Sequence, residues 1–359
     1  MQERGAQTEA YRAVATLYNA LVTAMVVSLV ARHGSALARE YVFRHFRRQH
    51  LEKFLPGLAK LGLAREPHAV ACALYHYHSN ALGGVHTEYV RESDRKAWVR
   101  YPPPRWMWRG TAIAAIPHEV SAAMLHGWHG HNGVSLGNPR LGFVCTGMTV
   151  DGMPGLEGYY LEHDRELAAE ERVRFEYGGQ VMPAFDPAAA PRLDSSAWPA
   201  ERLARTHRRY AMEYVRTMIP VLQELLGAPP AGQELGRVAR LVGLQFYAET
   251  ALPPAKPAQP GNHDSAHAFG AWFAALLAGQ GEEVSLDCAP GTATLHLPHW
   301  RLAQGVRLAD LAGAFHAWNE LWIGAGMAHD RFLRLKAEVT VSGERLAARW
   351  RIGRSGGKP

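Results

Sequence analysis

Apolar residues recur every three or four positions through the opening of the chain. They include Val14, Tyr18, Leu21, Met25 and Leu29. This spacing places them on one face and predicts an α-helix. A second helix is expected over residues 37–58, kinked or ended by Pro56, and a third over Pro67 to Asn80.

Alternating apolar and polar positions then predict a change to strands. Residues 85–91 and 95–101 indicate two strands joined by a short polar turn. Residues 117–131 predict a helix, and residues 141–150 and 156–161 a second hairpin. The predicted order is three helices, two strands, one helix and two strands.

The same order returns after residues 183–200, which are rich in Pro and Ala and predict a linker. The later elements are expected at 210–225, 235–242, 267–277, 283–288, 293–297, 309–322, 332–341 and 346–352. His126-Gly-Trp128 also matches His316-Ala-Trp318. We therefore predict an α+β protein of two similar domains, 1–182 and 201–359, produced by internal duplication.

The two predicted copies differ in polarity. When their ends are aligned, polar residues of the first copy mostly fall opposite apolar or uncharged residues of the second. The pairs are His129 with Asn319, His131 with Leu321, Glu157 with Ala348, and Tyr159 with Trp350. An active site is therefore expected in the first half, as a pocket lined by histidines.

Three kinds of chemistry fit these residues. In the first, His126, His129 and Glu157 act as general acids and bases, because imidazole and a buried carboxylate supply both functions near neutral pH. In the second, Cys145 is a nucleophile activated by a nearby imidazole, although a lone cysteine in Phe-Val-Cys is most often a small core residue.

The third is a divalent metal, zinc or manganese, held by the histidines. His126 and His129 share a helix face at a spacing of three residues. The chain has no HExxH or CxxC spacing, and such histidines are equally explained as buried imidazoles bonded to the backbone. The cofactor is thus left unknown.

Other residues are expected to contact a ligand. Arg105 and Trp106 belong to a tryptophan-rich segment that could orient a planar carboxylate or pack between the two halves. The further predicted contacts are His78, Asn80, Glu88, His131, Asn132 and Tyr159.

Composition and charge limit the classes of partner that we expect for the protein. A chain of 359 residues has room for about two domains. Its net charge of +6 is spread along the chain without a nucleic-acid motif, so no nucleic-acid partner is expected. The apolar run over residues 20–31 is too short to span a bilayer, so no membrane is expected either. Three cysteines, an odd number, favour a reducing cytoplasm, and a homo-oligomer is left open.

The order of elements, with the hairpin Asp151-Gly152…Leu156-Glu157-Gly158-Tyr159, resembles the L-2-amino-thiazoline-4-carboxylic acid hydrolase-like family over residues 9–165. The resemblance implies a small-ligand pocket in an α+β unit and hydrolysis of a cyclic C–N bond. The sequence thus predicts a small-molecule hydrolase acting on a C–N bond of a small cyclic carboxylate. The alternative is a non-catalytic sensor or carrier that binds a small ligand or a metal.

Overall fold

The computed structural model describes residues 2–104, 106–193, 196, 198–250, 265–303 and 305–354. The chain divides into two compact units. One, called the N-unit here, comprises Val26–Pro199, and the other, the C-unit, comprises Met1–Met25 with Ala200–Pro359. Helix α1 (Gln2–His33) contributes residues to both.

The N-unit packs helices on one face of a five-stranded sheet. Its helices are α2 (Ser35–Lys60), α3 (His68–Leu82), α4 (His118–Gly127) and α5 (Asn132–Ser135). Its strands are β1 (Glu88–Ser93), β2 (Lys96–Tyr101), β3 (Leu141–Gly147), β4 (Leu156–Glu162) and β5 (Val173–Phe175). The strand order is β1-β2-β4-β3-β5, and α3 packs on β1, β2 and β4.

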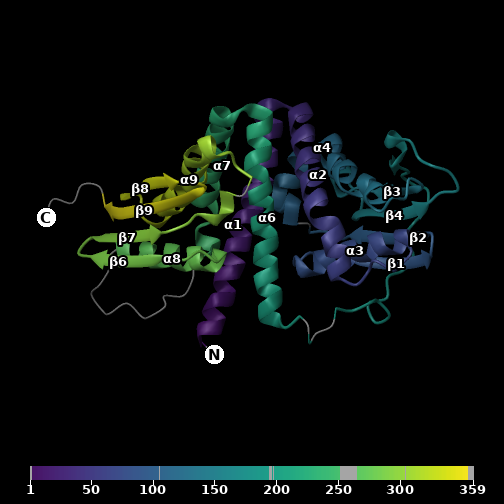
Figure 1. Ribbon diagram of the computed structural model, residues 1–359, viewed down its shortest axis with the longest axis horizontal. Helices are drawn as coiled ribbons and strands as arrows, with labels where there is room; N and C mark the ends of the chain where they lie inside the picture. Colours follow the sequence, from purple (N-terminus) through teal and green to yellow (C-terminus); the bar gives the residue numbers. More distant parts are fainter. Residues whose placement is uncertain are drawn as a thin grey trace. The chain divides into compact units, whose positions relative to one another are not determined.

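The C-unit has a four-stranded sheet, drawn in green to yellow in Figure 1. Its helices are α6 (Ala200–Leu226), α7 (Ala228–Phe246), α8 (Ser265–Gln280) and α9 (Leu311–His329). Its strands are β6 (Ser285–Ala289), β7 (Thr292–Leu297), β8 (Leu333–Ser342) and β9 (Arg345–Arg354). They pair antiparallel in the order β6-β7-β9-β8, with α8 and α9 on one face.

The α+β fold class is confirmed. The first four strands of each unit pair in the same relative order, which is what a duplication would produce, while common origin itself stays a prediction. Two local features differ from the expectation. Helix α2 continues through Pro56 to Lys60, and β5 adds a parallel strand beside β3 that has no counterpart among the described residues of the C-unit.

The division of the chain differs from the predicted domains of 1–182 and 201–359. The first residues of α1, up to Met25, group with the C-unit because their side chains find packing and hydrogen-bond partners there. Tyr18 donates a hydrogen bond to Gln280 Oε1 at 3.0 Å and accepts one from Trp318 Nε1 at 3.0 Å. Burial around these groups also raises the pKa of the Tyr18 phenol well above its usual value.

Helix α1 also bears on the membrane prediction. Over Gln7–His33 it is long and apolar enough to cross a bilayer. Of the apolar 18-residue stretch that meets this criterion, 72% is buried inside the structure. A buried core helix meets the same criterion of length and composition.

Two glycines set the distance between α7 and α9. A Cβ atom added to Gly324 of α9 would lie 2.1 Å from the Arg240 carbonyl oxygen of α7. One added to Gly243 of α7 would lie 2.0 Å from the Leu321 carbonyl oxygen of α9. The two helix backbones therefore touch at positions where no side chain fits.

Replacing Gly324 with Ala should destabilise the protein by about 1–3 kcal/mol, because the helices must separate to admit the methyl group. Gly313, on the same helix, has open space around it, so Gly313→Ala should stabilise by roughly 0.5 kcal/mol through helix propensity. Urea unfolding of both variants measures the difference. Equal effects at the two positions would contradict the close approach of α7 and α9.

Candidate functional site

A layer of polar side chains is buried between α3, the turn before α5, and the inner face of β4 in the N-unit. We call His76, His129, Asn132 and Tyr160 the polar layer. Each of the four is at most 6% exposed. The His76 and His129 rings stack with centroids 4.1 Å apart and an interplanar angle of 8°, and the Tyr160 ring lies nearly parallel to both.

Hydrogen bonds fix the roles of these groups. Asn132 Nδ2 donates to Tyr160 Oη at 2.8 Å. Tyr160 Oη lies 2.7 Å from His129 Nδ1 and has one proton to donate, so we assign the phenol as the donor and Nδ1 as the acceptor. His129 is consequently an acceptor at Nδ1, which in a neutral imidazole leaves the proton on Nε2.

His50 of α2 borders the polar layer on the side of Trp128. Arg47 donates to His50 Nδ1 at 2.8 Å. An arginine can only donate, so a neutral His50 carries its proton on Nε2. Among the described residues, neither this buried Nε2 nor Asn132 Oδ1 has a hydrogen-bond partner, although Asn132 lies close enough to His50 to oppose the lowering of its pKa. The donor and the acceptor thus lie near each other without a hydrogen bond of normal geometry between them.

Cationic side chains lie around this region. Burial lowers the pKa of His131, and Arg47 and Arg172 lower it further. Burial also lowers the pKa of His126, where Arg39 adds to the effect. Three arginines therefore act on the two outer histidines, and their field favours an anion near them.

Burial keeps the interior groups neutral. It lowers the pKa of His76 to about 3, with a smaller contribution from His50, and lowers that of His50 itself to about 3. It raises the pKa of the Tyr160 phenol well above its usual value, and likewise that of the neighbouring Cys72 thiol. At neutral pH these side chains are hydrogen-bonding groups without charge.

The corresponding layer of the C-unit is aromatic. In the same order of elements it contains Phe273, Asn319, Trp322 and Trp350, with the Phe273 ring 4.9 Å from Trp322 and 5.0 Å from Trp350. Its hydrogen bond runs from Trp350 Nε1 to Asn319 Oδ1 at 2.7 Å. Trp350 thus corresponds to Tyr160, not to Tyr159 as the sequence alignment had it. The alignment is displaced because the connection before β4 is longer than the tight turn before β9.

The structure brings together some of the predicted residues. His129 and Asn132 belong to the polar layer, and His131 lies beside His50 with ring centroids 6.2 Å apart. His131 Nδ1 also donates to the His126 carbonyl oxygen at 2.9 Å. The predicted concentration of buried histidines in the first half is confirmed.

Glu157 and Tyr159 are separated from His129 by the sheet. Side chains alternate along β4, so both point to the outer face, opposite Tyr160. There Glu157 Oε1 accepts hydrogen bonds from Thr146 Oγ1 at 2.9 Å and from the Met182 amide at 3.2 Å. Tyr159 packs with Trp98, Val144 and Met182 on that face. The predicted acid–base set of His126, His129 and Glu157 is therefore not assembled.

Four further predicted residues lie elsewhere in the N-unit. Glu88 accepts a hydrogen bond from Arg100 at 3.1 Å, and Asn80 donates to the His76 carbonyl oxygen at 2.6 Å. His78 is buried beside Tyr77, and burial lowers its pKa. Burial raises the pKa of Cys145 to about 12, so its thiol stays protonated and is better explained as a core residue than as a nucleophile.

Two predictions remain, ligand contacts by the tryptophan-rich segment and a divalent metal held by the histidines. Arg105 and the Trp106 side chain lie outside the described residues. Among those described, no group of three or more His, Cys, Asp or Glu side chains is placed to hold a metal ion. The His76 and His129 rings are stacked, so their in-plane lone pairs cannot converge on one ion.

Sequence reasoning did not select His50, His76 or Tyr160 for the site. His76 is next to Tyr75 in a run where His78 was chosen instead, and Tyr160 was lost through the one-residue displacement of the alignment. For His50 a signal existed. Phe46, His50 and Phe54 recur every four residues, the spacing of one helix face, and all three are buried.

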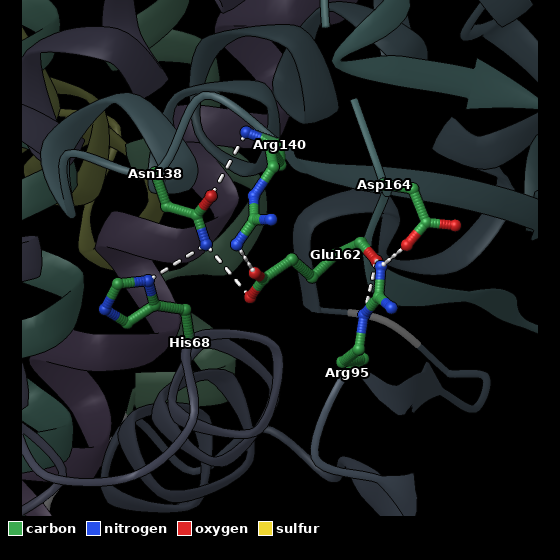
Figure 2. A network of polar contacts seen from close by, with 6 residues as sticks. All are labelled: His68, Arg95, Asn138, Arg140, Glu162 and Asp164. Atoms are coloured by element: carbon green, nitrogen blue, oxygen red, sulfur yellow. Dashed lines mark hydrogen bonds and ion pairs between the residues drawn. The ribbon is translucent and has the colours of Figure 1, made fainter. Parts of the chain in front are cut away.

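A polar network anchors the chain that follows the polar layer (Figure 2). Asn138 Nδ2 donates to His68 Nδ1 and to Glu162 Oε2, both at 3.0 Å, and its Oδ1 accepts from the Arg140 amide at 3.1 Å. Arg140 also pairs with Glu162, whose carbonyl oxygen binds Arg95 at 2.8 Å. The network joins the start of α3, the turn before β3 and the end of β4.

Asn138→Ala should lower the free energy of unfolding by about 2–3 kcal/mol, because it removes the hydrogen bonds of Asn138 to half-buried His68 and Glu162 and to the Arg140 amide. Asp164→Ala removes an exposed ion pair with Arg95 in the same network and should have no measurable effect. Chemical denaturation of both variants tests this. A loss at Asp164 as large as that at Asn138 would contradict the assignment.

Acid should destabilise the protein through its buried histidines. The pKa values of His45, His50 and His76 are lowered to about 3, against about 6.5 in an unfolded chain. The unfolded state therefore binds more protons between these values, and stability present above pH 6.5 is lost as the pH falls toward 3. In His76→Phe, the slope of unfolding free energy against pH should fall by up to about 1.4 kcal/mol per pH unit. An unchanged slope in urea unfolding at pH 4–7 would contradict the burial of a neutral His76.

Comparison with known proteins gave no relatives. The chain matches no family model, no curated protein and no solved structure.

Proposed function

We propose that the protein binds a small cyclic carboxylate in the N-unit, against the polar layer and His50, without chemically changing it. The observation that carries this proposal is the pair of unsatisfied buried atoms, His50 Nε2 and Asn132 Oδ1. An unsatisfied buried donor or acceptor costs about 1–3 kcal/mol. A ligand with one acceptor and one donor would satisfy both atoms.

The charge around the site supports an anionic ligand. Arg47 holds His50 from the outer side, and Arg172 and Arg39 act on the adjacent histidines. A carboxylate at this rim would be stabilised by the guanidinium groups. A planar ring beyond it would lie near aromatic side chains, because His50 packs edge-on against Trp128 and His76 stacks on His129 in the same layer.

Binding fits the site better than hydrolysis does. General acid–base catalysis works best when a group has a pKa near the working pH. His76 and His50 remain neutral down to about pH 3, Cys145 remains a thiol, and Glu157 lies across the sheet. Of the two functions expected from sequence, the non-catalytic ligand binder is the better supported.

The test is a thermal-shift screen of the full chain with thiazole-4-carboxylate, pyrrole-2-carboxylate and 5-oxoproline. A bound ligand at a hundredfold excess over Kd should stabilise the protein by about 2.7 kcal/mol. Asn132→Leu should abolish the shift, since it removes the unsatisfied acceptor, and Arg47→Gln should weaken it. Arg44→Gln is the matched control, because Arg44 is on the same helix and pairs with exposed Glu40.

Three results would overturn the proposal. They are no shift with any probe, a shift that survives Asn132→Leu, or equal losses from Arg44→Gln and Arg47→Gln. Mass spectrometry of the probe after incubation separates the two functions. Unchanged probe supports a binder, whereas a ring-opened product would establish the hydrolase.

A further inference from the structure

The outer face of the C-unit sheet is hollowed by a cleft of about 620 Å³. Its lining comes from all four strands and from the segments that flank β6 and β7, and includes Glu283, Ser285, His296, Pro298, Glu338 and Arg349. The cleft lies within the volume range typical of small-molecule sites. It belongs to a different unit from the site of the proposed function and is independent of it.

Four of the lining residues form one row across the sheet. Ser285 of β6 is the register partner of His296 of β7, His296 of Arg349 of β9, and Arg349 of Glu338 of β8. Residues in register on adjacent strands point to the same face. The helices cover the opposite face, where Leu295, Leu297 and Trp350 are buried.

Two opposite charges in this row are not satisfied by the protein. Among the described residues, neither Arg349 nor Glu338 has a hydrogen-bond or ion-pair partner, although each is the other's cross-strand neighbour. Glu283 differs, because it pairs with Arg301 at 3.0 Å. The cleft therefore presents one free guanidinium and one free carboxylate side by side.

Small neighbours leave room above the charged pair. Thr340 and Ala347 occupy the next register row, and Pro298 and Val284 form the wall beyond them. At the other end of the row from Glu338, His296 and Ser285 present polar side chains to the cleft. His296 Nε2 is 3.5 Å from Asp287. The hollow combines a charged end with a polar end.

We propose that this cleft binds a free α-amino acid with a polar side chain. Cross-strand neighbours point to the same face with Cβ atoms about 5 Å apart, so the side chains of Arg349 and Glu338 can both reach one small ligand that carries a cation and an anion on neighbouring atoms. The ligand carboxylate pairs with the Arg349 guanidinium in a two-pronged contact. Its ammonium pairs with Glu338, and its side chain extends over the sheet toward His296 and Ser285.

The affinity follows from the exposure of the charges. Because both charged groups are exposed to water, a ligand held by two such contacts should bind with a Kd of about 1 mM or weaker. Loss of one contact should therefore weaken binding about tenfold or more.

The experiment is an NMR titration of the full chain with L-glutamine, whose amide can both donate to and accept from the polar end. N-acetyl-L-glutamine lacks the cation and L-glutaminamide lacks the anion. L-glutamine should bind saturably, and each derivative about tenfold more weakly. Arg349→Gln and Glu338→Gln should each weaken L-glutamine binding by a similar factor.

Arg351→Gln is the matched control, since Arg351 is the next exposed residue on the same face of β9, outside the cleft lining. It should leave binding unchanged. A further check is that Glu338→Gln should not weaken the binding of N-acetyl-L-glutamine, because this probe has no ammonium group to pair with Glu338. Unchanged melting temperatures show that these surface variants fold.

Three results would overturn the proposal. The first is the absence of saturable binding of L-glutamine. The second is equal binding of the three probes, which would show that charge pairing is not used. The third is a loss with Arg351→Gln as large as that with Arg349→Gln, which would indicate attraction to the general charge of the face.

Discussion

The N-unit is built around a desolvated hydrogen-bonded chain that runs from Asn132 through Tyr160 to His129, with His76 stacked beside it. Burying such groups without partners is costly, so each must be held where its partner can reach it. This requirement explains why the turn around His129–His131, the first residues of α5 and strand β4 meet here. It also explains the network around Asn138, which fixes the chain immediately downstream.

The two units solve the same packing problem in different ways. Both place an aromatic side chain of the last antiparallel strand pair against the preceding helices and hydrogen-bond it there. Tyr160 bonds to His129 and Asn132, and Trp350 bonds to Asn319. The C-unit fills the rest of the layer with Phe273 and Trp322, and the buried Trp322 Nε1 has no hydrogen-bond partner among the described residues. The N-unit uses His76 and Asn132 and leaves an acceptor unsatisfied. The two layers therefore differ in the kind of group they bury, mainly hydrogen-bonding imidazole and amide groups in the N-unit and mainly aromatic rings in the C-unit, and this difference is why we propose the N-unit as the ligand site.

Much of the architecture is readable from the sequence, because helices and strands here follow simple apolar periods. The order of elements, the break near residue 199 and the enrichment of histidines in the first half all follow from such patterns. The placement of α1 residues with the C-unit does not, since it depends on Tyr18 meeting Gln280 and Trp318, more than 260 residues away in the chain.

The candidate site shows where sequence reasoning loses accuracy. A shift of one residue in a strand exchanges its two faces, and for β4 this replaced Tyr160 with Tyr159 and suggested that Glu157 joins the histidines. The place of His50 beside the polar layer, and the lack of charge on the buried imidazoles, depend on how α2, α3 and the sheet pack together. No local pattern reports how deeply a side chain is buried or which arginine lies next to it.

The most direct test of the central claim is a crystal structure of the full chain grown with thiazole-4-carboxylate or 5-oxoproline. The account predicts that the compound lies between His50 Nε2 and Asn132 Oδ1, with its carboxylate toward Arg47. A compound bound elsewhere, or an unchanged polar layer in which His50 and Asn132 bond directly to each other, would contradict it.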